Sequence, residues 1–248
     1  HSPVIAALKK ALSALGRVIT IAPDRDNSAI SHALTMNRPL LLKELEQDVY
    51  SLNGTPVDCV AIGLNKVINP PPDLLVSGIN AGANLGDDIS YSGTVSAALE
   101  DTPYSIPSMA VSQAGSPPAD YDFAADFSVK LAAKVLKSGL PSNTLMNVNF
   151  PKTLPPDGLR VTRQGRRIWR QPVREVEDPW GRKHFWIGGG IPLLDAGKDT
   201  YVHALEQGFI SVTPIHLDLT NHEGISYFRE DLSLETLPKC TGFTADPS

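Results

Sequence analysis

The chain has 248 residues, of which 42% are apolar and 20% are charged, and its formal net charge is −5. This balance is typical of a globular protein of one or two domains, large enough to bury a core without disulfide or metal support. With a negative net charge, the sequence lacks the overall basic character that binding of duplex nucleic acid usually requires. No apolar run reaches membrane-spanning length. We therefore expect neither duplex nucleic acid nor a membrane as a partner.

Cysteine usage indicates a reducing compartment. The 2 cysteines, Cys59 and Cys240, lie far apart and match neither a disulfide framework nor a metal-binding spacing. The features of a signal peptide are missing from the sequence as printed. These observations together predict a cytoplasmic location.

Helical and strand-like patterns alternate through the first 150 residues. Helices are predicted over residues 4–15, 55–68, 95–100 and 119–136. Buried strands are predicted over 18–21, 74–76, 107–112 and 145–150, and a small hairpin over 39–45 and 49–53. This alternation predicts an α/β fold with a Rossmann-like, mostly parallel sheet flanked by helices.

The first predicted helix and strand form the second half of a β-α-β unit. A parallel strand should precede that helix, and the sequence begins at His1, too late to contain it. We expect this strand and the loop that follows it to lie upstream of His1.

The pattern changes after Pro151. Strands are predicted over residues 159–163, 167–175, 183–187 and 209–214, with a turn at 178–181 and a short helix over 199–207. We expect residues 1–150 to form the α/β catalytic core, and residues 151–248 to form a β-rich extension with a C-terminal arm used in oligomerisation.

Three polar segments, residues 22–28, 53–56 and 77–94, follow the expected strands. Ligands of open α/β sheets bind at the carboxyl ends of the strands, so these segments should meet around a ligand. The third is rich in glycine, which lets the backbone come close to a ligand, and it leads into a helix N-terminus that favours an anion. Asparagine and serine oxygens also suit Mg²⁺ or Mn²⁺. The alternative is a purely structural turn.

Other phosphate and nucleophile motifs do not match this segment. The spacing of Gly78, Gly82 and Gly86 differs from the dinucleotide fingerprint, which disfavours a nucleotide-binding oxidoreductase, and the Gly-Lys-Ser/Thr of a P-loop is absent. Ser92 lacks the G-x-S-x-G elbow of a serine hydrolase. We therefore favour a site for metal and phosphate over a purely structural turn.

Four blocks in order carry a family resemblance. They are Ala22-Pro23-Asp24-Arg25 with Ser28, Gly54-Thr55-Pro56 with Asp58, Ser77-Gly78-Ile79-Asn80 with Asn84 and Gly86-Asp87-Asp88, and Tyr91-Ser92-Gly93-Thr94. Together they resemble the signature of the SurE family of metal-dependent phosphatases. Residues 160–163, 212–214 and 218–220 extend the resemblance over nearly the whole chain.

The resemblance implies hydrolysis of nucleoside 5'- and 3'-monophosphates, with short polyphosphate as a further substrate, in a homodimer or homotetramer. It implies a divalent metal, Mg²⁺ or Mn²⁺, bound by Ser28 and Asn80, and phosphate bound by Asn84, Ser92, Gly93 and Thr94. In this family two adjacent aspartates of an Asn-Asp-Asp-Gly motif complete the metal site. They are expected upstream of His1, so no catalytic residue is assigned within the chain.

Some assignments stay open at this stage. Without the aspartate pair the chain could be a catalytically silent oligomer that binds phosphate or nucleotide. Asp26 could orient Ser28 or could cap the loop. Asp58 is interpreted as a helix-capping acid. Asp218 and His222 could be an acid–base pair, and a loop hydrogen bond is the preferred interpretation.

Overall fold

The computed structural model describes residues 3–100, 105–115, 121–170, 173–188, 191–194 and 197–232, and only the backbone of 167–170 and 191–194. The chain divides into two compact units, His1–His216 and Leu217–Ser248. The helices of the first unit are α1 (Pro3–Leu12), α2 (Pro56–Ile62), α3 (Gly93–Leu99), α4 (Asp122–Ser138) and α5 (Tyr201–Glu206). A π-helical turn, η1 (Gly63–Val67), follows α2, and a 3-10 helix, η2 (Gly86–Tyr91), precedes α3.

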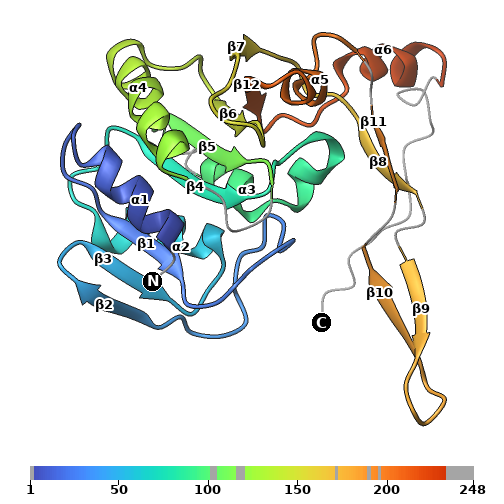
Figure 1. Cartoon of the computed structure of the whole chain (residues 1–248), viewed down its shortest axis with the longest axis horizontal. Coiled ribbons are helices and arrows are strands. Elements are labelled where there is room, and N and C mark those ends of the chain that lie inside the picture. Colours follow the sequence, from blue (N-terminus) through green and yellow to red (C-terminus); the bar gives the residue numbers. More distant parts are fainter. Residues whose placement is uncertain are drawn as a thin grey trace, which may run out of the picture. The chain divides into compact units, whose positions relative to one another are not determined.

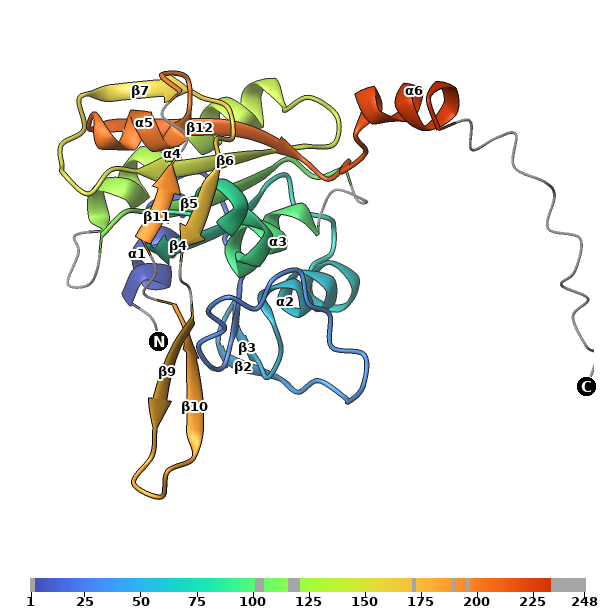
Figure 2. The same ribbon diagram turned by 90° about the vertical axis from the view of Figure 1, so that its right-hand side faces the viewer.

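The central sheet has five strands in the order β4 (Leu75–Ala81), β5 (Ser108–Gln113), β6 (Thr144–Phe150), β12 (Phe209–His216) and β7 (Gly158–Val161). The first three run parallel to one another, β12 is antiparallel to β6, and β7 is parallel to β12. Helices cover both faces of this sheet (Figures 1 and 2). The predicted α/β class is confirmed.

A smaller sheet lies beside the first, in the order β1 (Thr20–Pro23), β3 (Val49–Leu52) and β2 (Leu42–Glu46). The predicted hairpin corresponds to β2 and β3, which are antiparallel. The sequence did not indicate that β3 also pairs with β1, in parallel register from Thr20↔Val49 to Pro23↔Leu52.

Two apolar clusters hold the central sheet and its helices together. On one face, Met109, Val111, Val148 and Phe150 pack with residues of α1 and α4. On the other face, Ala110 and Leu145 pack with residues of α3 and α5. Successive residues of a strand point to opposite faces of the sheet, and here both faces are covered by helices. Strands of this kind are largely continuous apolar runs, which is the sequence pattern from which β5 and β6 were predicted.

The region after residue 161 differs from the expectation. The single strand predicted over 167–175 is wrong, because β8 (Arg167–Arg170) and β9 (Val173–Glu177) are separate strands. β8 pairs with β11 (Ile191–Leu194), which was not predicted, while β9 pairs with β10 (Lys183–Ile187). The predicted turn joins β9 to β10, where Asp178 Oδ1 accepts from the backbone N–H of Trp180 at 2.9 Å and of Arg182 at 3.0 Å. A carboxylate that closes a turn in this way is a local signal that sequence reveals.

The structure divides the chain at His216, and not at the boundary expected after residue 150. β12 and β7 come from the later part of the chain and complete the same sheet as β4 to β6. The second unit contains α6 (His222–Glu230), a helix that was not predicted and that begins after Asn221, whose side chain caps it. None of the described helices is both long and apolar enough to cross a membrane.

Candidate active site

The three polar segments of the sequence meet in the structure, as predicted. Ser31, which follows the first segment, donates its backbone N–H to the Tyr91 carbonyl at 3.0 Å and its hydroxyl to the Ser90 carbonyl at 2.6 Å. Asn27 Nδ2 donates to the Gly54 carbonyl at 3.4 Å. These bonds tie the first segment to both others, at the carboxyl ends of β1, β3 and β4.

Gly93 stands where the three segments touch. A Cβ at this position would lie 3.0 Å from Pro56 Cγ and 3.1 Å from Ile30 Cγ2, closer than ordinary packing allows. A side chain here would push the start of α3 away from the two loops. The glycine therefore permits the close packing that forms the site.

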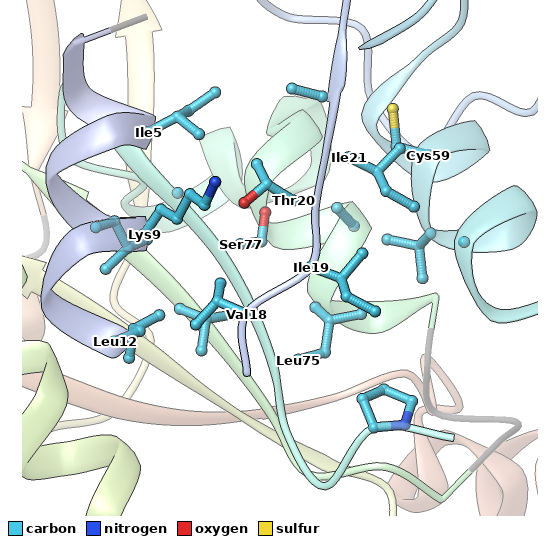
Figure 3. Close-up of a pocket in the computed structure, with 18 of the residues that line it drawn as sticks. Ile5, Lys9, Leu12, Val18, Ile19, Thr20, Ile21, Cys59, Leu75 and Ser77 are labelled. Atoms are coloured by element: carbon cyan, nitrogen blue, oxygen red, sulfur yellow. The ribbon is translucent and has the colours of Figure 1, made fainter. Parts of the chain in front are cut away.

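A cavity of about 790 Å³ opens between the two sheets. Apolar residues of α1, α2, the segment 18–23 and β4 line most of it, and Figure 3 shows Lys9 extending from α1 toward Thr20 and Ser77. Its polar lining includes Asp26, Ser28, Asn80 and Thr94. Three of the predicted site residues, Ser28, Asn80 and Thr94, thus line one cavity.

The cavity separates two strand edges. β1 is an edge strand of the smaller sheet and β4 is an edge strand of the larger one. Each therefore has one side that pairs with no other described strand. Side chains of Val18, Ile19, Leu75 and Ser77 line the space between these edges (Figure 3). Two open edges with an apolar lining have the chemistry that accepts a further strand.

The glycine-rich segment begins later than predicted. The expectation of a loop from Ser77 is wrong for Ser77–Ala81, because β4 continues to Ala81 and pairs with β5 up to Gln113. The pairing shifts register between Ser77 and Asn80. Asn80 therefore stands on a strand, which holds it more rigidly than a loop would.

The Asn80 side chain has a defined orientation. Its Nδ2 donates to the Gly82 carbonyl at 2.8 Å, and Thr94 Oγ1 donates to its Oδ1 at 3.5 Å. An oxygen facing the Gly82 carbonyl would be repelled, so the amide nitrogen must take that side. The amide oxygen is consequently the atom turned toward Thr94 and available to a cation.

Ser28 is held by Asp26. The Asp26 Oδ1 atom accepts from the Ser28 hydroxyl at 2.7 Å and from the Ser28 backbone N–H at 3.0 Å. Asp26 thus serves both proposed roles, closing the loop and orienting the hydroxyl. Because the hydroxyl proton points to Asp26, the lone pairs of Ser28 Oγ are left for another partner.

Asn84 is buried and is held by residues of β5 and β6. Its exposed fraction is 8%, and its Nδ2 donates to the Ser112 hydroxyl at 2.7 Å. Its backbone N–H donates to Asn149 Oδ1 at 2.9 Å, and its carbonyl accepts from Asn149 Nδ2 at 3.3 Å. An amide nitrogen carries two hydrogens, so donation to Ser112 still leaves one for a phosphate oxygen.

Ser92, Gly93 and Thr94 form the start of α3. Ser92 is the N-cap, and its Oγ accepts from the Val95 backbone N–H at 3.1 Å. This bond satisfies one of the helix's free N–H groups and gives Ser92 a structural role. Of the three residues only Thr94 lines the cavity.

The N-terminus of α2 is fixed by Asp58, as predicted for a capping acid. Its carboxylate accepts from the backbone N–H of Thr55 and of Thr35, each at 2.8 Å, while Thr55 Oγ1 accepts from the Asp58 N–H at 3.0 Å. Burial raises the pKa of Asp58, but the hydrogen bonds from Thr35 and Thr55 outweigh it and leave that pKa below its usual value. Burial, with the charges of Asp58 and Asp24, raises the pKa of the neighbouring Cys59 thiol to about 12.

The described residues include oxygen ligands of the type that a divalent metal binds, but they do not supply the negative charge that such a site needs. Ser28 and Asn80 offer neutral oxygens of the type that Mg²⁺ and Mn²⁺ bind. Across the described ranges, no group of three or more His, Cys, Asp or Glu side chains gathers around a common point. These residues alone therefore do not complete a divalent cation site.

Asp218 and His222 lie in the second unit. His222 Nε2 is 2.8 Å from Asp218 Oδ2, and the Thr220 N–H donates to Asp218 Oδ1 at 2.8 Å. The bonds from Thr220 and then from His222 lower the pKa of Asp218. The pair is solvent-exposed, in agreement with the loop hydrogen bond that we preferred.

Two sets of contacts near the site were not predicted from the sequence. Ser112 and Asn149 bind Asn84 from strands β5 and β6, and polar residues within buried strands were the only signal for them. His32 Nε2 lies 2.8 Å from Glu100 Oε2 and links the first polar segment to the residue after α3. Nothing in the spacing of these two residues, 68 apart, indicates that they meet.

Comparison with known proteins gives concordant results. The family model described as "Survival protein SurE" matches residues 1–171. The 5'-nucleotidase SurE of Syntrophotalea carbinolica is 52% identical over 223 residues, which cover 89% of this chain and 89% of that protein. The 5'-nucleotidase SurE of Moorella thermoacetica is 46% identical over 230 residues, covering 90% and 88%.

A solved structure matches the fold. The crystal structure of the SurE protein from Aquifex aeolicus has a TM-score of 0.80 and 40% sequence identity, and the match covers 92% of this chain and 95% of that one. The family match spans more than half of the chain and includes the cavity, its polar residues and the start of α3. The chain therefore belongs to the SurE family.

Proposed function

We propose that this protein is a phosphomonoesterase that hydrolyses nucleoside 5'-monophosphates to nucleoside and phosphate. The observation that carries the proposal is that Ser28, Asn80 and Thr94 line one cavity. Relatives at 46–52% identity are named 5'-nucleotidase SurE. Activity on 3'-monophosphates and on short polyphosphate belongs to the same proposal, since the oxygen and N–H groups of this site would recognise the phosphate group that all these substrates share.

The proposal includes a divalent metal, Mg²⁺ or Mn²⁺. Ser28 and Asn80 would bind it, with carboxylates contributed by a segment that precedes His1. Such an ion, when bound, would polarise the phosphate and lower the pKa of a bound water. Neutral ligands are weak partners for a divalent cation, so the charge of those carboxylates is what the described site lacks.

The same segment would fill the apolar part of the cavity. An extended strand between β1 and β4 would pair with both open edges and join the two sheets. A loop after it, before α1, would then lie near Ser28 and Asn80, since β1 and β4 both end at the polar segments. This arrangement matches the upstream strand that the β-α-β pattern predicts.

The chain's own residues would hold the phosphate. The Thr94 hydroxyl donates to Asn80 Oδ1 in this structure and would turn to the phosphate when that oxygen binds the cation. Gly93, Thr94 and the Asn84 amide would donate N–H groups to the phosphate oxygens. α3 has seven residues, so its dipole adds less than these direct hydrogen bonds. Donors fixed in advance would stabilise the charge that develops as the phosphoryl group passes from the nucleoside oxygen to water.

Phosphate release from AMP, with and without Mg²⁺ or Mn²⁺, tests the function. We expect the full-length protein to hydrolyse AMP only when the metal is present, and EDTA to stop the reaction. The chain that begins at His1 should be at least about 100-fold slower, because one half of the metal site is removed. If the full-length protein releases no phosphate with either metal but still binds AMP, the silent binding protein is the correct alternative.

We also propose that the protein is a homodimer or homotetramer in the cytoplasm. Every residue of β10 is exposed, among them Phe185 at 61%, Trp186 at 68% and Ile187 at 85%. Large apolar side chains on an exposed hairpin are typical of an interface. The buried free thiol of Cys59 suits a reducing compartment.

Replacing Phe185 and Ile187 by serine tests this assembly. We expect the double variant to shift toward monomer, because the contact would lose about 3 kcal/mol of apolar burial. Sedimentation equilibrium measures the shift, and Leu45→Ser, at an exposed site on β2 outside the cavity, is the control. An unchanged association constant in the double variant would show that the hairpin is not the interface.

A further inference from the structure

A stripe of polar side chains crosses one buried face of the central sheet. On β6 the residues facing this side are the apolar Leu145 and then Asn147 and Asn149, both 0% exposed. Ser112 on β5 and Ser211 on β12 stand beside Asn149 in register. Burying an amide costs free energy unless its hydrogen bonds are satisfied, so such a stripe in a core calls for a specific reason.

Asn149 makes two hydrogen bonds to the backbone of a single residue of the glycine-rich segment, Asn84. Its Oδ1 accepts the Asn84 N–H at 2.9 Å, and its Nδ2 donates to the Asn84 carbonyl at 3.3 Å. These two side-chain bonds take the place of the backbone hydrogen bonds that Asn84 would make to a neighbouring strand if it lay within a sheet. Asn84 lies beyond the end of β4, with Gly82 at φ 121° and Gly86 at φ 60° on either side.

Asn147 provides a natural comparison on the same strand and face. Its Nδ2 reaches the Asn84 carbonyl at 3.4 Å, the longer of the two contacts to that oxygen. Its Oδ1 accepts no hydrogen bond from the part of the chain that the structure describes. Asn147 is therefore buried to the same extent as Asn149 but holds Asn84 less firmly and does not contact its N–H.

We propose that Asn149 is a positioning residue: by holding both the N–H and the C=O of Asn84, it fixes the Asn84 backbone, and thereby the Asn84 side chain, in the geometry that receives the phosphate. Glycines on both sides leave this segment many backbone conformations, and the two bonds from Asn149 select one. Without these bonds the Asn84 side chain would not be held in one orientation. A donor stabilises phosphate effectively only when its orientation is fixed in advance. The inference rests on the proposed function and adds a residue remote in sequence to its site.

The test compares Asn149→Leu with Asn147→Leu in the full-length protein. Leucine has the branched shape of asparagine, is larger by a similar amount at both positions, and makes no hydrogen bond. In Asn149→Leu we expect the KM for AMP to rise about tenfold or more, with amide exchange of residues 82–86 about tenfold faster. In Asn147→Leu the same quantities should change less than about threefold. Asn149→Ala and Asn147→Ala serve as the pair if a leucine variant does not fold.

The outcomes separate this inference from the proposed function. Equal changes in both variants, in KM and in exchange, would overturn the positioning role and leave a general effect of core substitution. If the parent protein releases no phosphate from AMP, the proposed function fails, and the exchange measurement still decides whether Asn149 restrains Asn84. Faster exchange confined to Asn149→Leu together with a raised KM supports the inference.

Discussion

Asn80→Ala is expected to reduce metal-dependent phosphate release from AMP by about 100-fold or more in the full-length protein. The Asn80 Oδ1 atom is turned away from the Gly82 carbonyl by the bond that its own Nδ2 makes there, and it faces Thr94. Alanine removes this oxygen and also the acceptor that orients the Thr94 hydroxyl. The initial rate of phosphate release at saturating Mg²⁺ or Mn²⁺ measures the loss.

Two further variants make this result specific. Asn65→Ala, at an exposed asparagine whose Nδ2 bonds to the Ala61 carbonyl, controls for the loss of an asparagine amide outside the cavity. Asn80→Asp keeps an oxygen and should retain more activity than Asn80→Ala if that oxygen binds the cation. An Asn80→Ala enzyme within about threefold of the parent would remove Asn80 from the site.

The elements of the central sheet could be predicted because their signal is local. Strands covered on both faces are continuous apolar runs, and the helices between them carry one apolar stripe. The meeting of the three polar segments followed from the same pattern, since parallel strands place their carboxyl ends on one edge. The glycine and asparagine residues of the third segment are the basis for predicting which residues at this edge bind the ligand.

Other features depend on contacts between distant residues. Asn84 could be predicted as a site residue, but not its bonds to Ser112 and Asn149, which lie 28 and 65 residues away. The continuation of β4 to Ala81 was missed because glycine and asparagine are poor strand formers, and pairing with β5 overrides that preference. β11 was missed for the same reason: its partner β8, more than twenty residues earlier, defines it.

The strand that we propose before α1 would take the cavity between β1 and β4. The sequence predicts a parallel strand before the first helix, and the structure has a cavity of about 790 Å³ at the place that such a strand would take. Because the edges of both sheets line this cavity, its occupant would determine how rigidly Ser28 is held relative to Asn80. Binding of the segment and formation of the metal site would then be coupled.

Gly78→Ala is expected to lower the free energy of unfolding by about 3 kcal/mol or more. Gly78 has a φ of 135°, which side chains rarely adopt, and a Cβ there would overlap the carbonyl oxygen of Val111 on β5. Since this contact is with backbone, the strand itself would have to move. The movement would separate β4 from β5 at the point where Asn80 is held, so activity should fall together with stability.

Gly82→Ala and Gly16→Ala separate the two causes of this loss. Gly82 has a φ of 121°, but a Cβ there would meet only Asn80 Nδ2, at 3.9 Å, so its substitution measures backbone strain without the clash. Gly16 has no atom within 4 Å of the added Cβ and no positive φ, and its substitution should change stability by less than about 1 kcal/mol. Urea denaturation followed by circular dichroism gives all three values. A Gly78→Ala protein no less stable than Gly82→Ala would mean that β4 does not approach Val111 as closely as described.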